Sequence, residues 1–551
     1  MKKFSDITDL IANILSMPPM EEHPLFESNE PKKLPFEPPI PLHLLSKEEG
    51  EPFIWWNGYQ LPFRNIGSHF VTIGSIGSGK TVLTNNSIKS VLDVIEKGET
   101  NTKAVVIETK GGTLQMLEAM KIPYLYFNIS DKRSSDWDTE KDCSDVQEAG
   151  EMAKNLNPPK QHSSDSFWGD SVDVTIASVV EALTYLKIMT GRKWSFHEVY
   201  QICMSDLATL IKILKLFPTC SDVVTKLLDG TSEKTLSIVM MQLLVELRPL
   251  KMAAAHSKNT KHKFSITEFL KDDSTLPKVL VLSWDVNANR YSMPIIQAMF
   301  ETMTNKINSM TDDDHRKIFI FLDEARFIGK LRKLPDLAVY GRSKGARLWL
   351  TIQTIEGFWS IYSKDVANEI LGVCGYKTLL KAASPDTAKW MCSLAGEIEF
   401  FETVVNPNFG QGGVSFSHQK QRVRRLAVLD SEFLKLSPPD EKVGITGFFL
   451  SPFARGNKET IPTEEIERAK PRYADVPDLV PKDPLDKILP LWTLEEAESF
   501  YQSLVENLKN GKQKSVASPQ ENFRGMIFDQ LEPTLRKIIK ELARRIKNEK
   551  N

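Results

Sequence analysis

The sequence has few cysteines, and none of them stands in a pattern that would pair it or bind a metal. The five cysteines of the 551-residue chain are scattered and never form a C-x-x-C pair. Such spacing argues against a disulfide framework or a zinc site and favours a reducing compartment. No spacing of His, Cys and Asp suggests another metal site made by the protein alone. Small disulfide-rich and zinc-stabilised folds are therefore excluded.

Long apolar runs and a large net charge are also missing. No stretch reaches 18 uncharged apolar residues, and the N-terminus lacks the pattern of a signal peptide. We therefore expect a cytoplasmic protein without a transmembrane helix. The formal net charge is −2, so a nucleic-acid partner can be argued only from local basic patches. A chain of this length should divide into several domains.

What the sequence does contain is a phosphate-binding loop. Two glycines separated by four residues precede Lys-Thr, in the order Gly74, Ser75, Ile76, Gly77, Ser78, Gly79, Lys80 and Thr81. A buried strand is predicted before the loop (His69–Ile73) and a helix after it (Val82–Glu96), as this motif requires. We therefore expect ATP to bind these residues and Val82, with Lys80 on the phosphates and the Thr81 hydroxyl on Mg²⁺. The alternative is a chance glycine-rich turn.

Strands and helices alternate on both sides of a long helical stretch. Apolar runs predict further strands at Lys103–Glu108, Tyr124–Phe127, Lys278–Ser283, Lys317–Leu322 and Ala346–Gln353. Their alternation with helices, such as Pro294–Asn308, predicts an α/β fold with a parallel sheet. Between them, helical periodicity predicts an inserted all-α domain with helices at Phe167–Met189, Ser195–Phe217, Asp222–Leu228 and Glu233–Leu247.

Two carboxylates follow the predicted strand Lys317–Leu322. In a P-loop NTPase the first acid at such a strand end holds Mg²⁺ through water, and the second orients and deprotonates the attacking water. We therefore expect Asp323 to serve the metal and Glu324 to act as the catalytic base. The alternative is an acidic strand end with a structural role.

Two further polar residues flank the next predicted strand. Gln353 ends it at the nucleotide edge of the sheet, where its amide could sense the γ-phosphate, hold the water or merely cap the strand. Arg342 precedes the strand, in a segment that in ring-forming ATPases often reaches the neighbouring subunit's nucleotide. It is a candidate arginine finger or a surface arginine.

Basic clusters mark other candidate contact surfaces. Three arginines compete for the finger role or for a subunit interface, namely Arg422, Arg424 and Arg425. Lys251 and the stretch His256–Lys263 form a candidate loop for tracking nucleic-acid phosphates, or a solvated connector. The final segment, Glu532–Asn551, predicts a basic amphipathic helix that contacts nucleic acid, an acidic partner or a membrane surface, or is merely solvated.

Proline marks both ends of the chain. Eight prolines between positions 18 and 41 predict an extended arm, and the charge- and proline-rich composition after 455 predicts a linker with short acidic helices. The expected organisation is an arm (1–50), a nucleotide-binding domain in two parts (51–133 and 257–455), the all-α insertion (134–256) and a charged C-terminal tail (456–551).

With these residues in order, the chain resembles the conjugative type IV secretion coupling proteins, the TraD/TraG group of the FtsK/HerA-like hexameric motors. The resemblance covers about residues 53–455 and rests on the hairpin motif Trp56, Gly58, Leu61 and Pro62, on Lys110-Gly111, Phe167-Trp168, Leu322–Ala325, Gly341–Gly345 and Gln353. Two departures are evident. The family often has Asp-Pro-Lys-Gly where this chain has Glu108–Gly111, and most members begin with transmembrane helices.

The resemblance implies a RecA-like P-loop NTPase domain with Lys80 and Thr81 on phosphate and Mg²⁺ and with Asp323 and Glu324 as the acid pair. It implies that Arg342 acts in trans and that Gln353 links the nucleotide to DNA-contacting loops. It also implies a homo-oligomer, a hexamer, whose partners are DNA, a relaxase or secreted protein and secretion-channel components, with peripheral attachment to the inner membrane through them.

The function expected is a ring-forming ATPase that couples ATP hydrolysis to the movement of DNA, or of a DNA–relaxase complex, towards a type IV secretion channel. Three alternatives stay open at this point. They are a coupling ATPase for protein effectors, a scaffold with a vestigial ATPase, and a HerA-like DNA translocase in DNA processing or defence.

Overall fold

The structure is a computed structural model that describes residues 50–98, 100–109, 111–156, 166–217, 220, 233–410 and 413–516. The chain forms two compact units. Unit 1 holds the described residues up to Asn86, Ile352–Ser360 and Cys374–Ala469, and unit 2 holds Ser87–Thr351, Ile361–Val373 and the described chain from Lys470. The arm predicted before Gly50 and the helices predicted at Asp222–Leu228 and Glu532–Asn551 lie outside the described residues. Within these ranges, no helix combines the length and apolar character of a membrane span.

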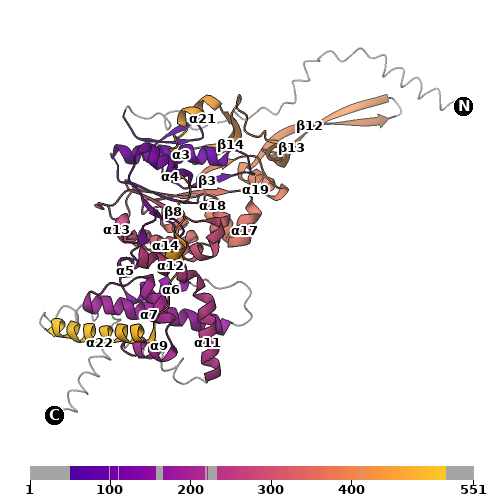
Figure 1. Ribbon diagram of the computed structural model, residues 1–551. Coiled ribbons are helices and arrows are strands. Elements are labelled where there is room, and N and C mark those ends of the chain that lie inside the picture. Colours follow the sequence, from indigo (N-terminus) through magenta and orange to yellow (C-terminus); the bar gives the residue numbers. More distant parts are fainter. Residues whose placement is uncertain are drawn as a thin grey trace, which may run out of the picture. The chain divides into compact units, whose positions relative to one another are not determined.

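Unit 1 is built on strands in the order β15-β14-β11-β3 (Figure 1). β3 and β11 are parallel, and the other neighbours are antiparallel. The hairpin motif Trp56, Gly58, Leu61 and Pro62 lies in an antiparallel hairpin. Its turn, Asn57-Gly58, has positive φ at both residues, as a two-residue hairpin turn requires. The elements of the unit are β1 (Phe53–Trp56), β2 (Tyr59–Pro62), β3 (Phe70–Ile73), β11 (Tyr376–Leu379), α19 (Pro385–Ala395), β12 (Glu397–Gly410), β13 (Gly413–Leu426), α20 (Asp430–Lys435), β14 (Ile445–Ser451), β15 (Ala454–Ile461) and α21 (Thr463–Ala469).

Unit 2 contains strands in the order β10-β9-β4-β8-β5, all parallel. Every residue of β4, β8, β9 and β10 is buried. Both faces of a parallel sheet are covered, and this is why these strands are predictable as nearly continuous apolar runs. The predicted strands are confirmed as β4 (Thr102–Glu108), β5 (Leu125–Phe127), β8 (Val279–Ser283), β9 (Lys317–Leu322) and β10 (Ala346–Ile352), with helices α4 (Gly112–Met120), α14 (Asn289–Asn308), α15 (Ala325–Ile328), α16 (Leu334–Tyr340) and α18 (Lys364–Gly372).

A group of helices occupies the chain between the short strands β6 (Asp136–Trp137) and β7 (Lys263–Phe264). The sequence predicted one helix over 195–217, whereas the structure has two. The second begins anew because the Asp206 carboxylate accepts hydrogen bonds from Thr209 N (3.0 Å) and Thr209 Oγ1 (2.6 Å) and so caps it. The helices are α6 (Val146–Leu156), α7 (Ser166–Thr190), α8 (Phe196–Cys203), α9 (Leu207–Leu214), α11 (Glu233–Glu246) and α12 (Arg248–Asn259).

Helix α12 changes the interpretation of the basic stretch around His256. The side chains of His256 and Ser257 are buried, and the His256 ring contacts the Ser135 carbonyl oxygen at 3.1 Å. Burial, assisted by the charge of Lys482, lowers the pKa of His256 to about 3. The prediction of a basic loop is therefore wrong for 256–259, because this part is helical and two of its side chains fill the interior of unit 2.

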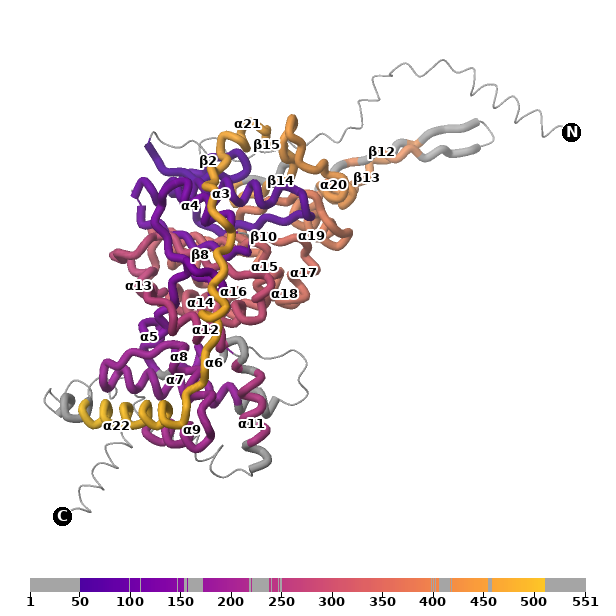
Figure 2. The backbone as a smooth tube through the Cα atoms, in the orientation of Figure 1, coloured from indigo at the N-terminus to yellow at the C-terminus, as the bar shows by residue number. Residues whose placement is uncertain are grey.

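The chain after Lys470 packs along unit 2 as an extended strap, residues 470–493 (Figure 2). Backbone hydrogen bonds fasten it, including Lys132 N to Val480 O at 2.8 Å and Lys482 N to Ser130 O at 3.2 Å. The strap leads into α22 (Leu494–Val516), which packs against α7 and α9 and buries Ala497 and Leu504. The sequence predicted a linker here, whereas the structure has an ordered strap. Linkers and ordered straps share a polar, proline-rich composition, so the sequence alone does not distinguish them.

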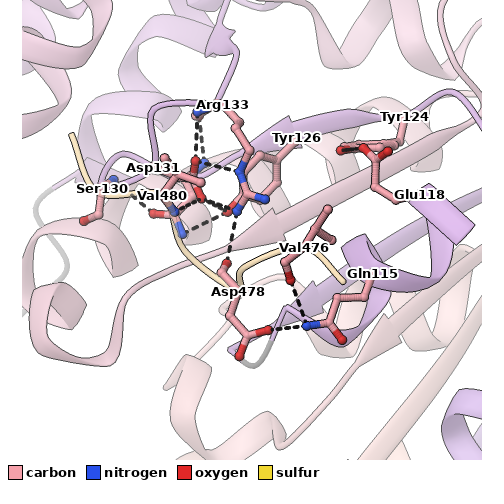
Figure 3. A network of polar contacts seen from close by, with 12 residues as sticks. Gln115, Glu118, Tyr124, Tyr126, Ser130, Asp131, Arg133, Val476, Asp478 and Val480 are labelled. Carbon is pink, nitrogen blue, oxygen red and sulfur yellow. Dashed lines mark hydrogen bonds and ion pairs between the residues drawn. The ribbon is translucent and has the colours of Figure 1, made fainter. Parts of the chain in front are cut away.

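Asp131 is the polar centre of the strap's attachment (Figure 3). Its fully buried carboxylate accepts hydrogen bonds from Arg133 Nε (3.0 Å) and NH2 (2.7 Å) and from the strap's Val480 N (3.1 Å). Burial alone would raise the pKa of Asp131, but these bonds outweigh it and hold the pKa below its usual range. Arg133 also donates to the Asp478 carbonyl oxygen, so one ion pair orders two strap residues.

Replacing Asp131 with Asn should loosen the strap. The change leaves Arg133 with a neutral partner in a largely dry site, and we expect it to cost about 2–4 kcal/mol of unfolding free energy. Urea denaturation and limited proteolysis of residues 470–493 measure the effect. The control Glu268→Gln, in an exposed pair with Lys271, should leave both unchanged. Equal behaviour of the two variants would contradict the role given to Asp131.

Candidate nucleotide site

The phosphate-binding loop lies between β3 and α3 (Lys80–Lys97), the strand–loop–helix context predicted for it. The first two residues of the loop are held by backbone hydrogen bonds within unit 1. Gly74 N donates to Ile352 O at 3.3 Å, and Ser75 N donates to Lys381 O at 2.7 Å. The loop then rises so that Ile76 is 83% exposed, while Thr81 and Val82 are exposed in the first helical turn. The positive end of α3 is therefore presented beside a loop of fixed shape.

The residues of the loop fit a bound phosphate chain. The buried Lys80 ammonium donates to Gly74 O and Ser75 O, both at 2.8 Å. The Ser78 hydroxyl is buried and has no hydrogen-bond partner among the described residues. A nucleotide phosphate would give both groups a negatively charged partner, and a Mg²⁺ ion in such sites takes few protein oxygens and completes its shell with phosphates and water.

Glycine is required at two loop positions for different reasons. Gly79 has φ +96°, and a Cβ there would lie 2.7 Å from Ile445 Cδ1. Gly74 has no room, because its Cβ would lie 2.6 Å from Ser78 Oγ and 2.8 Å from Leu380 Cβ. Gly79 gives the turn its left-handed conformation, and Gly74 allows the close approach of the loop to Ser78 and Leu380.

In unit 2 the two predicted acids follow β9. Asp323 N donates to Ile107 O of β4 at 3.2 Å, so the acids lie at the carboxyl edge of the sheet. Glu324 has φ +53° and ψ +60°, the left-handed conformation that non-glycine residues rarely adopt. Such strain is concentrated at functional sites, where the surroundings hold it. Nowhere in the described chain do three or more His, Cys, Asp or Glu side chains gather to hold a metal ion.

Glu108 is a candidate residue that the sequence analysis did not assign. It ends β4 beside the acids, and its carboxylate accepts hydrogen bonds from Thr113 N (3.0 Å) and Thr113 Oγ1 (2.8 Å) at the start of α4. Burial raises its pKa to about 7, and the charges of Asp323 and Asp478 act in the same direction. In the sequence, Glu108 is recognisable only as an acid at the end of a predicted strand. Its burial depends on contacts that form in the folded protein.

Arg342 and Gln353 lie at opposite ends of β10. Arg342 is exposed in the turn that precedes the strand, and Ala346 at the strand's start pairs with Ile318 near the start of β9. The six residues of β9 therefore separate Arg342 from Asp323, about 20 Å along the strand. Gln353 follows Ile352, whose carbonyl oxygen binds Gly74 N, so its backbone adjoins the loop's first glycine.

The competing arginines belong to a different part of unit 1. Arg422 and Arg424 lie on β13, and both form ion pairs with Glu399 of β12. Arg422 and Arg424 are thus engaged on their own hairpin.

Strand–loop–helix geometry and a parallel sheet define the class of this protein: it has the RecA-like P-loop fold with an all-α domain. The sequence model of the family described as "Type IV secretion-system coupling protein DNA-binding domain" matches residues 56–454. The chain belongs to this family. No curated protein matches it.

Solved structures of TrwB show the same fold. The bacterial conjugative coupling protein TrwBdeltaN70 is 18% identical, with a TM-score of 0.60, and the match covers 79% of this chain and 92% of that one. The plasmid coupling protein TrwB in complex with ADP and Mg²⁺ is 18% identical, with a TM-score of 0.61 and coverage of 80% and 94%. TrwB with a non-hydrolysable ATP analogue is 17% identical, with a TM-score of 0.60 and the same coverage.

The raised pKa of Glu108 makes the stability of the protein depend on pH. Between about pH 4.5 and pH 7 the folded state keeps a proton that the unfolded state releases, so stability falls as the pH rises through this window. Without nucleotide or Mg²⁺, wild type should lose on the order of 2–3 kcal/mol more than Glu108→Gln between pH 4.5 and pH 7.5. Urea denaturation across this range measures the difference.

The matched control is Glu118→Gln, on the helix that Glu108 caps. Glu118 is exposed, so its variant should follow the wild-type pH dependence. If Glu108→Gln does the same, the carboxyl of Glu108 is ionised in the folded protein and the account of its burial is wrong.

Proposed function

We propose that this chain is a ring-forming, Mg²⁺-dependent ATPase that couples ATP hydrolysis to the movement of DNA, or of a DNA–relaxase complex, towards a type IV secretion channel. The observation that carries the proposal is the Gly74–Thr81 loop, held at the positive end of α3 with the Lys80 ammonium inside it. This arrangement binds the phosphates of a nucleoside triphosphate.

In this proposal the loop from Gly74 to Val82 binds the phosphate chain. On binding, Lys80 exchanges the Gly74 and Ser75 carbonyls for the β- and γ-phosphate oxygens. Thr81 and Asp323 would supply protein oxygens for Mg²⁺, and the ion would neutralise charge on the phosphates. The TrwB complexes with ADP and Mg²⁺ and with an ATP analogue support the choice of ligand.

Glu324 is proposed to orient the attacking water and accept its proton. Its left-handed backbone, directly after β9, is the kind of local strain that is concentrated at functional sites. Gln353, directly after the strand whose end binds Gly74, is proposed to sense the γ-phosphate and to pass its state to DNA-contacting loops.

Arg342 is proposed to act as the arginine finger of the neighbouring subunit. Its place before β10 keeps it away from Asp323 and Glu324 of its own chain. A guanidinium at that position can therefore stabilise transition-state charge only in another subunit, and such a group is worth about 10³–10⁵ in rate. The ring proposed is a hexamer, in which assembly gates hydrolysis.

DNA is the proposed cargo because the chain belongs to a family described by its DNA-binding domain. Delivery of a protein effector is the second candidate. It is favoured by four exposed apolar side chains on α11 of unit 2, Ile238, Met241, Leu244 and Val245. An apolar helix face of this kind suits a protein partner better than a phosphate backbone.

Steady-state ATP hydrolysis without and with single- and double-stranded DNA tests the proposal. We expect stimulation by DNA and a loss of about 10²–10⁴-fold in Lys80→Ala and in Glu324→Gln, since these groups bind transition-state charge and accept the proton. The control Lys89→Ala, which removes an ion pair with Asp93 within α3, should keep wild-type rates. Hydrolysis that depends on Lys80 but ignores DNA would favour the protein-cargo candidate, and no hydrolysis would refute both.

A further inference from the structure

A long two-stranded ribbon extends from unit 1. β12 and β13 have 14 residues each and pair from Glu397–Leu426 at the base to Gly410–Gly413 at the far end. At about 3.4 Å per residue the ribbon is about 45 Å long, whereas a domain of about 150 residues has a radius of gyration near 15 Å. Figure 1 shows it leaving the other strands of unit 1 near α19. The ribbon therefore reaches well beyond its own unit.

Both outer edges of the ribbon are open in the described part of the chain. It forms a separate sheet of two strands, so each strand has one edge without a neighbour in the described chain. Isolated two-stranded ribbons are marginally stable in water, and long open edges are sites for pairing with another chain. A ribbon of this length requires a surface to pack on.

One face of the ribbon combines apolar and basic side chains. Alternate residues of a strand share a face, and the register pairs Phe401 with Arg422 and Thr403 with Lys420. Phe401 is 71% exposed, and Val405, two pairs further along the same face, is 46% exposed. Near the base, Glu399 forms ion pairs with both Arg422 and Arg424, so its carboxylate offsets one of these two positive charges.

The distribution of charge along the ribbon indicates which kind of partner it binds. From Thr403 to Gln419 the sequence has no Asp, Glu, Lys or Arg. A surface that tracks nucleic acid spreads cations along its length, which this stretch lacks. A bilayer is also a poor match, because the open strand edges would leave backbone groups unsatisfied in hydrocarbon. The uncharged stretch from Thr403 to Gln419, with its open strand edges and the exposed Val405, fits a protein surface.

We propose that the β12–β13 ribbon is an assembly arm that packs on a second copy of this chain through its Phe401–Val405 face and its open edges. The inference rests on the proposed ring, which places identical subunits side by side within the ribbon's reach. The arm gives each subunit a contact that does not depend on nucleotide. Ring formation and the catalytic site are therefore separable by mutation.

The test uses the full chain with residues 403–420 replaced by Asn-Gly, a two-residue hairpin turn that keeps the Glu399 ion pairs. In sedimentation velocity with a non-hydrolysable ATP analogue and DNA, wild type should form rings, and the shortened variant should lose at least about tenfold in assembly affinity, a loss expected for a truncated interface anchor. Its affinity for the ATP analogue should stay within twofold, because the loop is untouched.

Point variants and cross-linking locate the contact. The pair Phe401→Ser and Val405→Ser should weaken assembly in the same direction, whereas Val443→Ser, an equally exposed apolar position of unit 1, should not. A benzoylphenylalanine photo-cross-linker at position 401 should yield a product of two copies of the chain.

The outcomes distinguish the two proposals. Rings in both wild type and the shortened variant would overturn the arm and leave the proposed ATPase intact. Absence of rings in wild type, with active hydrolysis or without it, would overturn the ring and the arm together. Cross-links from position 401 only to DNA, to lipid or within the same chain would also overturn the arm.

Discussion

The direction of parallel strands decides what each part of this molecule can do. Hydrogen bonding between β9, β4 and β10 in unit 2 requires the three strands to end at one edge of the sheet. Asp323, Glu324 and Glu108 follow strand ends and meet there, whereas Arg342 precedes a strand and lies a strand length away. One chain therefore holds Asp323 and Glu324 at one edge of the sheet and Arg342 near the opposite edge. This separation is the reason for proposing that Arg342 acts on a neighbouring subunit.

Each unit holds an ionisable side chain whose electrostatics are set by the surroundings in that unit. In unit 1, Lys80 is buried and donates to carbonyl oxygens of its own loop. Under the proposed function, a phosphate would find this cation in place and would replace its neutral partners with a charged one. In unit 2, the edge that carries Asp323 is kept dry enough to raise the pKa of Glu108 to about 7. The strap contributes to the raised pKa of Glu108 through the negative charge of Asp478, which lies against Gly111 beside the end of β4.

Features with a local sequence signal are predicted well, and features that depend on distant contacts are missed. The loop Gly74–Thr81, the buried strands and the acid pair have fixed spacings or continuous apolar runs, so they are predictable without tertiary information. Burial of His256, the docking of residues 470–493 and the environment of Glu108 depend on contacts with distant segments. The ribbon has no sequence motif, and none of its side chains whose burial the structure describes is buried. The strain at Glu324 is visible only in the backbone. The roles given to the site residues remain predictions.

The account depends most on catalysis between subunits, and a complementation assay tests it directly. Arg342→Ala and Glu324→Gln should each be inactive alone. In rings mixed at equal amounts, about a quarter of the interfaces combine an intact Glu324 with an intact Arg342 from the neighbour, so up to about a quarter of the DNA-stimulated ATPase rate should return. Mixed rings that stay as inactive as their parents would contradict the account, as would an Arg342→Ala variant that is fully active alone.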